Sequence, residues 1–115
     1  FSAFGAGYKT FLERHQKKYG EKPIAPFHAH AYDAAMMTFA AIEKVAKKGP
    51  DGTLYIGRRA LRDAFYATKN FKGLTGNLTC DKYGDCADPR IAIYKTSVEN
   101  IKNLVLPDTP FWKPY

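Results

Sequence analysis

Three groups of residues in this chain carry side chains that could do chemistry, and the first could hold a metal. His28, His30 and Asp33 form an H-x-H-x-x-D pattern, and imidazole and carboxylate groups are ligands for zinc and iron. On a strand the two histidines would share a face, but on a helix they diverge by about 200°. The surrounding pattern is helical, so we expect no metal here. His28 is then a candidate pocket residue at a helix start, and His30 a partly buried helix residue.

The second group is acidic. Asp81, Asp85 and Asp88 could imitate a calcium loop, but the twelve-residue spacing with a terminal Glu is absent, which favours turn formation. No nucleophile elbow, phosphate loop or Ser-His-Asp order occurs in the sequence. We therefore expect no enzyme and no cofactor.

The third group is the pair Cys80 and Cys86, the chain's two cysteines. Five intervening residues, which include the Tyr83-Gly84-Asp85 turn signal, could return the chain and bring the two side chains into bonding range. A metal site would want further ligands nearby, and none is obvious. A local disulfide is therefore favoured, which points to an oxidising compartment, and a pair of free thiols is the alternative.

Composition limits the classes of function. The 115 residues have an ordinary globular balance, with 45% hydrophobic and 25% charged residues. The net charge of +7 could indicate a nucleic-acid partner, but the basic residues occur singly or in pairs such as Lys17-Lys18 and Lys47-Lys48. A solvated basic surface is favoured, and no nucleic acid is expected. No apolar run reaches the roughly 18 residues that a membrane span needs.

Helical periodicity predicts three helices that would position these residues. An amphipathic helix is expected at about 3–20, because aromatic and apolar residues recur there at spacings of three and four. A second is expected at about 28–48, buried on more than one side because its first turns are almost uncharged. The third is expected at about 58–68, and 54–56 is either a short extended piece or its lead-in.

Two strands are expected after the helices. Apolar residues bounded by glycines predict a β-hairpin with strands at about 76–81 and 90–95, followed by an extended tail at 98–115. Two isolated strands are marginal in water. The pattern therefore predicts that more sheet comes from a further N-terminal portion or from another copy of the chain.

Several stretches also resemble a known family. They are FLERHQKKYGEKP (11–23), AHAYDAAMMTFAAIEKVAKK (29–48), GRRALRDAFYATKNFKGLTGNLTCDKYGDC (57–86) and the hairpin stretch 71–94. Their order is similar to that in the C-terminal third of the extracytoplasmic solute-binding proteins of branched-chain amino-acid ABC transporters. The resemblance covers roughly Phe4 to Tyr94.

The resemblance implies an α/β fold class. Residues 1–115 would be the C-terminal segment of a two-lobed type I periplasmic-binding-protein fold, with about three helices plus a C-terminal β-hairpin. Such receptors are periplasmic or extracytoplasmic and carry an amino acid or small carboxylate to an ABC permease in the membrane. Phe27, just before the second helix, would offer an apolar surface to the ligand beside His28, although a core role for Phe27 is equally open. The N-terminal remainder of the receptor would supply most polar ligand contacts.

Other functions stay open at this point. A ligand-sensing domain of the same fold would serve signalling instead of import. A metal-dependent hydrolase would use His28, His30 and Asp33, and a basic nucleic-acid-binding module would use the surface lysines. If the chain stands alone, we expect it to self-associate to complete its sheet.

Overall fold

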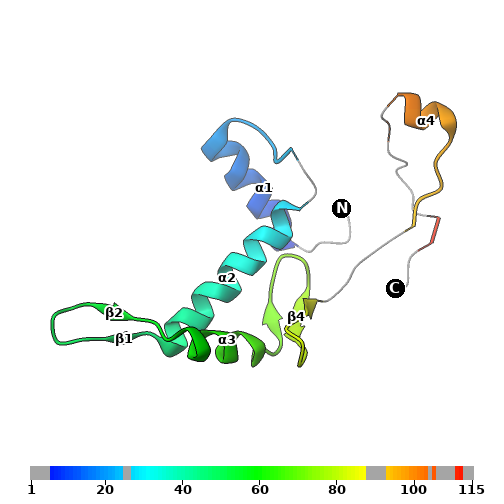
Figure 1. The fold of residues 1–115 in the computed structure, drawn as a ribbon. Coiled ribbons are helices and arrows are strands. Elements are labelled where there is room, and N and C mark those ends of the chain that lie inside the picture. The colour runs from blue at the N-terminus through cyan, green and yellow to red at the C-terminus, as the bar shows by residue number, and fades with distance from the viewer. Residues whose placement is uncertain (1–5, 25–26, 88–92, 104, 106–110, 113–115) are drawn as a thin grey trace.

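A computed structural model of the chain describes residues 6–24, 27–87, 93–103, 105 and 111–112. Within them the fold is mixed α/β, with helices and two small antiparallel sheets (Figure 1). The helices are α1 (Ala6–Tyr19), α2 (His28–Val45), α3 (Arg58–Tyr66) and α4 (Val98–Lys102). The strands are β1 (Lys47–Lys48), β2 (Leu54–Tyr55), β3 (Phe71–Lys72), β4 (Asn77–Cys80) and β5 (Cys86–Ala87).

Helix α2 is the longest element, and it is buried along one stripe only. Its buried residues, spaced four apart, are Ala29, Asp33, Met37 and Ala41. Phe39 on the same helix is 58% exposed. The expectation of burial on several sides was therefore wrong for the described part of the chain, where no element covers the second apolar face of α2.

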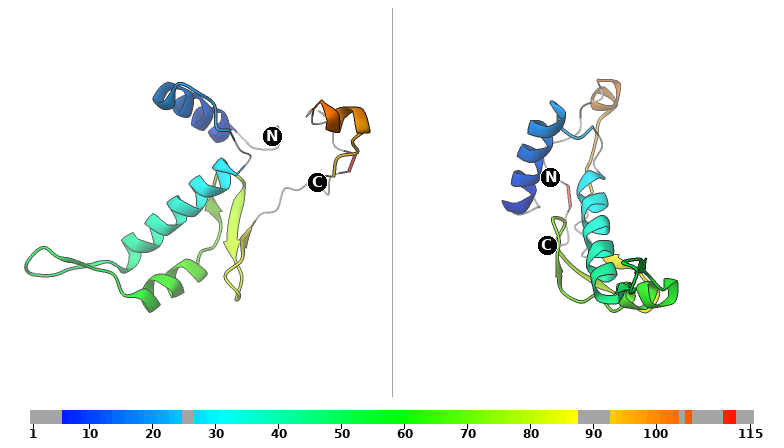
Figure 2. Two further views of the ribbon diagram at one scale, coloured as in Figure 1. Left: turned by 45° about the horizontal axis from the view of Figure 1, so that its top comes forward. Right: turned by 90° about the vertical axis from the view of Figure 1, so that its left-hand side faces the viewer.

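The end of α2 also differs from the prediction. The helix stops at Val45 and not at Lys48, because Ala46 is extended (φ −65°, ψ 135°) and the chain enters β1. The Gly49-Pro50-Asp51-Gly52 turn then reverses it, and Lys47 pairs with Tyr55 while Lys48 pairs with Leu54. The ambiguous residues at 54–55 are thus a strand. The β1–β2 hairpin projects away from the helices (Figures 1 and 2).

The three-stranded sheet has the order β3-β4-β5. Strand β4 lies within one residue of its predicted bounds at each end, but its partners differ from the prediction. One partner is β3, which was not expected, and the other is β5 at Cys86–Ala87 instead of a strand at 90–95. The turn is short because Asp81 accepts hydrogen bonds from the backbone N–H groups of Tyr83 and Asp85. Residues 90–92 of the predicted strand lie outside the described residues, and Ile93 forms an isolated bridge with Trp112.

The core lies where this sheet meets α2 and α3. Met37 of α2 packs with Leu78 and Cys80 of β4, and partly buried Phe65, Phe71 and Cys86 surround them. Helix α3 runs along the C-terminal half of α2 (Figure 2). Together α2, α3 and the β3-β4-β5 sheet form what we call the packed unit.

The predicted extended tail contains a short helix, which corrects that expectation. Helix α4 (Val98–Lys102) forms because the Ser97 hydroxyl accepts a hydrogen bond from the Asn100 backbone N–H, 3.1 Å away. Glu99 in the first turn and Lys102 in the last suit the helix dipole. The helix is only five residues long, so hydrophobic periodicity alone gives little signal for it.

The described part of the chain is open. Its radius of gyration is 18.4 Å, whereas a compact domain of this length has one of about 13 Å. Its accessible surface of 9275 Å² compares with about 6300 Å² for a compact protein of its mass. Large apolar side chains contribute to this surface, since Phe39, Leu54 and Tyr55 are more than half exposed. Among the described residues, no helix has the length and apolar character required to traverse a bilayer.

Candidate ligand-binding site

The start of α2 meets α1 through a stack of rings. The His28 ring lies parallel to those of Tyr8 and Phe11, with centroids 5.6 and 5.7 Å away. Phe11 also meets Tyr32 edge-on, with centroids 5.3 Å apart. A hydrogen bond of 2.8 Å joins the Tyr8 hydroxyl to His28 Nε2. Burial raises the pKa of the Tyr8 hydroxyl, so the hydroxyl keeps its proton at neutral pH and can donate it to this bond.

Two adjoining open hollows lie against these rings. The larger, of about 520 Å³, is lined by Gly7, Thr10, Phe11, Arg14, His15, Lys18, Tyr19, Tyr32 and Leu74. Its charged lining residues are both cations, Arg14 and Lys18. The second hollow, of about 430 Å³, shares Phe11, His15, Tyr19 and Tyr32 with the first and adds Glu21 and His28. Ring walls with two cations suit a small ligand that combines an apolar part with a carboxylate.

The two predicted site residues have different positions. His28 lines the smaller hollow, but its ring also holds α1 against α2. Phe27 is 72% exposed and lines neither hollow, so the structure assigns it no core role. Its role in ligand binding stays a prediction.

Sequence reasoning missed most of the lining, which comes from α1. The spacing of aromatic and apolar residues predicted an amphipathic surface helix here, but no ligand contact was predicted for Phe11, His15 or Tyr19. The signal was present in their chemistry, because a face made almost entirely of rings differs from an aliphatic one.

The possible metal ligands do not come together. His28 faces α1, His30 is exposed, and Asp33 is buried against the loop between β3 and β4. In the described part of the chain, no three His, Cys, Asp or Glu side chains are placed to hold a metal ion. The H-x-H-x-x-D pattern is therefore not gathered into one site by this fold.

Asp33 instead connects α2 to the β3–β4 loop. One carboxylate oxygen accepts the Leu74 N–H at 2.7 Å, and the other accepts the Thr75 N–H at 2.8 Å and the Thr75 hydroxyl at 2.7 Å. Asp33 is 2% exposed. Gly73 lies so close that a Cβ there would be 2.5 Å from a carboxylate oxygen. A buried carboxylate thus fixes this loop, and at Gly73 the backbone approaches the carboxylate too closely for a Cβ.

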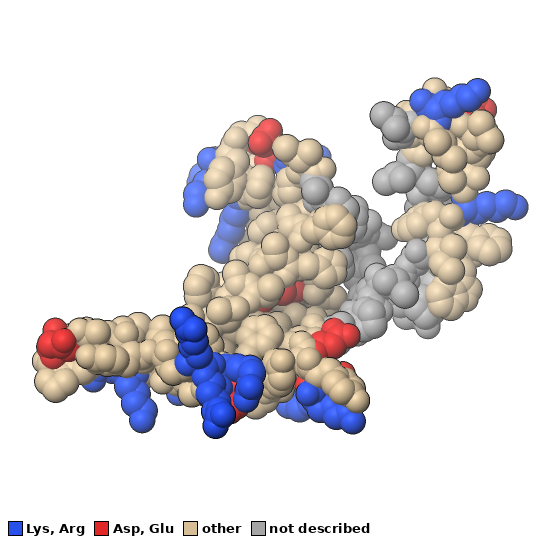
Figure 3. All heavy atoms as spheres, in the orientation of Figure 1, with Lys and Arg blue, Asp and Glu red and all other residues tan. Residues whose placement is uncertain are grey.

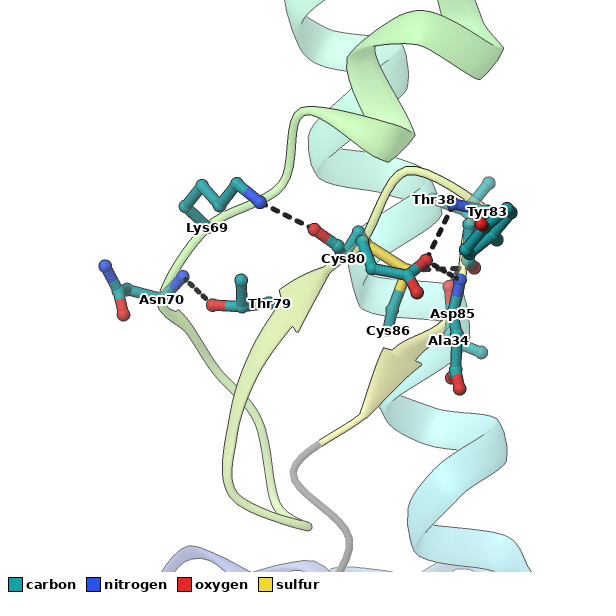
Figure 4. Close-up of a disulfide and its surroundings, with 11 residues drawn as sticks. Ala34, Thr38, Lys69, Asn70, Thr79, Cys80, Tyr83, Asp85 and Cys86 are labelled. Atoms are coloured by element: carbon teal, nitrogen blue, oxygen red, sulfur yellow. Dashed lines mark hydrogen bonds between the residues drawn. A yellow bond between two sulfur atoms is a disulfide. The ribbon is translucent and has the colours of Figure 1, made fainter.

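Cys80 and Cys86 form a disulfide across β4 and β5, as predicted (Figure 4). Cys80 is fully buried, and its backbone is held on both sides. Its N–H donates to the Thr68 carbonyl and its carbonyl accepts from Lys69 Nζ at 2.6 Å. The disulfide therefore sits in the packed unit as a structural clamp, away from the ring-lined hollows.

Comparison with known proteins identifies no family. No family model matches the chain, and neither a curated protein nor a solved structure matches it.

Proposed function

We propose that this chain is part of the solute-binding component of an ABC importer of the branched-chain amino-acid type. It would capture an amino acid or related small solute in a cleft between lobes and deliver it to a membrane permease. The observation that carries the proposal is the junction at Asp33. Asp33 belongs to the AYDAA stretch and Leu74-Thr75 to the GLTG stretch, and both stretches carry the resemblance. Three hydrogen bonds make them one structural unit, as is expected of signature residues that serve one fold.

The open shape supports the same proposal. A chain that leaves large rings and aliphatic side chains exposed buries too little surface for a self-contained receptor. An N-terminal remainder of the receptor would cover part of this surface and supply the second lobe. The exposed second face of α2, which includes Met36 and Phe39, is the surface that such a remainder would cover.

The ligand would lie beside the start of α2. Arg14 and Lys18 would pair with its carboxylate, and the rings of α1 and Tyr32 would contact its apolar part. Phe27 lies at the entry to α2, and its exposed ring would meet the ligand side chain when the lobes close. The extracytoplasmic location follows from this role, and the disulfide agrees with it.

The test is a thermal-shift screen of the protein expressed from its complete gene, against amino acids and small carboxylates. A ligand at 100 times its Kd should stabilise the protein by about 2.7 kcal/mol and raise Tm by several degrees. Isothermal titration then gives the Kd. If no member of the panel shifts Tm, the import proposal is wrong.

A matched pair of variants tests whether the ligand binds at Phe27. Phe27→Ala should weaken binding about tenfold, because a ring contact with the ligand is lost. Tyr83→Ala is the control, since Tyr83 is 75% exposed, similar to Phe27, and lies in the turn between β4 and β5. Equal affinities for the two variants would remove Phe27 from the site and leave the proposal of solute binding standing.

A further inference from the structure

The β1–β2 hairpin and the start of α3 combine basic and apolar side chains in a way that the proposed solute site does not use. We call this region the arm, residues 46–59. It bears four cations at Lys47, Lys48, Arg58 and Arg59, all exposed. None of these four forms an ion pair with a described residue. The acidic residue within the arm is Asp51 at the tip, and Thr53 engages its carboxylate through two hydrogen bonds.

The apolar residues of the arm are exposed beside the cations. Leu54 is 57% exposed, Tyr55 58% and Ile56 38%. Lys47 pairs with Tyr55, and Lys48 pairs with Leu54. Paired residues share a face of a two-stranded ribbon, so each face presents one lysine next to one apolar side chain. The Tyr55 ring also lies against the turn, where a Cβ at Gly49 would be 2.8 Å from it.

The start of α3 adds a further site for negative charge. Gly57 caps the helix without a side-chain hydrogen bond, and the first turn contains no acidic residue. Arg58 and Arg59 stand instead at the positive end of the helix dipole, where cations are unfavourable. An external anion would relieve this repulsion and accept hydrogen bonds from the free N–H groups of the first turn. Lys and Arg side chains extend from the region of this hairpin and α3 (Figure 3).

We propose that the arm docks on a membrane surface that contains anionic phospholipids. The cations would pair with lipid phosphates, while Leu54, Tyr55 and Ile56 would enter the boundary between headgroups and acyl chains. Long lysine stems can lie along apolar surface while the ammonium groups stay among the headgroups, which suits the mixed faces of the ribbon. A purely electrostatic partner such as a nucleic acid would explain the cations but would leave the three apolar side chains in water.

The test is co-sedimentation of the full chain with vesicles of phosphatidylglycerol and phosphatidylcholine, and with phosphatidylcholine alone. Binding should need the anionic lipid and should weaken in 0.5 M salt without vanishing, because screening removes the electrostatic part only. Absence of binding to the anionic vesicles overturns the proposal. This measurement needs no variant, and it is independent of whether the receptor binds a solute.

Variants then assign the binding to the arm. Lys47→Gln with Lys48→Gln should lower the partition coefficient about thirtyfold, since each lysine near an anionic surface contributes about a factor of five. Lys9→Gln with Lys17→Gln on α1 is the control, with the same loss of charge from exposed positions. An equal loss in both pairs means attraction by net charge and refutes a role for the arm.

The apolar contribution needs its own variant. Leu54→Ser with Tyr55→Ser should reduce vesicle binding at least tenfold and leave binding to soluble heparin unchanged. If this variant binds vesicles as well as the parent chain does, the surface is a general polyanion surface and the membrane proposal is wrong. Far-UV circular dichroism confirms that each variant retains the parent fold before binding is compared.

Discussion

The β1–β2 and β4–β5 hairpins are closed by the same turn chemistry but have opposite surroundings. In the β1–β2 hairpin, Asp51 accepts the N–H and hydroxyl of Thr53. In the β4–β5 hairpin, the carboxylate of Asp81 accepts two backbone N–H groups in the turn. Each turn also has a glycine at positive φ, 84° at Gly52 and 88° at Gly84. Local sequence closes both hairpins in the same way.

Their packing differs completely. Leu78 and Cys80 of the second hairpin are buried under α2, and a disulfide joins its strands. The strand residues of the first hairpin are all exposed. The contrast shows that a turn determines where the chain reverses, whereas burial depends on which elements lie against it.

The largest expected effect comes from breaking the attachment of the packed hairpin at Asp33. Asp33→Ala would leave the Leu74 N–H, the Thr75 N–H and the Thr75 hydroxyl without their acceptor in a buried place. We expect a loss of about 3 to 5 kcal/mol in the free energy of unfolding, measured by urea denaturation.

A double-mutant cycle isolates this contact. Gly73→Ala should destabilise the parent chain, because the new Cβ would meet the Asp33 carboxylate. The same substitution should be much milder in the Asp33→Ala background, where the carboxylate is gone. Additive effects would show that the two residues do not interact and would contradict the geometry described above.

Removing the disulfide should have the next largest effect. Cys80→Ala with Cys86→Ala should lower the free energy of unfolding by about 2 kcal/mol from loop entropy, and by somewhat more from lost packing at buried Cys80. Hydrogen exchange should accelerate in β4 and β5 but not in β1 and β2. Thiol labelling of the native chain without reductant should modify neither cysteine, and complete labelling would show that the bond is absent.

The two turn glycines compare the hairpins directly. Alanine at either position incurs about 1 kcal/mol of backbone strain at positive φ. Gly84→Ala should lower the free energy of unfolding by about 1 to 2 kcal/mol beyond this strain, because its Cβ would lie 2.6 Å from the Tyr66 ring. Gly52→Ala meets only the end of Lys48 at 3.9 Å. Thermal unfolding of both variants tests this order, and equal Tm values would mean that Tyr66 moves aside freely.

The smallest expected effect is that of acidification on the turn of the β1–β2 hairpin. The Thr53 hydroxyl, and then the Thr53 N–H, lower the pKa of Asp51 below its ordinary value of 3.8. Because the folded-state pKa is depressed, the stabilisation is complete above the unfolded value and is lost as pH falls through the folded pKa. Amide exchange at Thr53 should therefore accelerate only below about pH 4. Asp51→Asn should remove this dependence, and its persistence would assign the effect to another group.

The sequence patterns predicted where the helices begin better than they predicted the short elements and contacts around them. The starts of α2 and α3 were predicted at the observed residues, since periodicity and glycine signals are local. The early end of α2, strand β3 and helix α4 were missed, because two-residue strands and a five-residue capped helix give almost no periodic signal. For the candidate site, His28 was predicted as a ligand contact and lies at the smaller hollow, where its role stays a prediction; the ring-lined face of α1 was not connected with it.

The sequence by itself determined the turns, the cysteine pairing and the starts of α2 and α3, because each depends on residues a few positions apart. Only the tertiary structure decided that Asp33 serves a loop about forty residues later, that the rings of α1 meet His28, and that one hairpin is packed while the other is exposed. Those outcomes depend on which surfaces meet after the chain has folded, and many long-range pairings are compatible with the same local pattern.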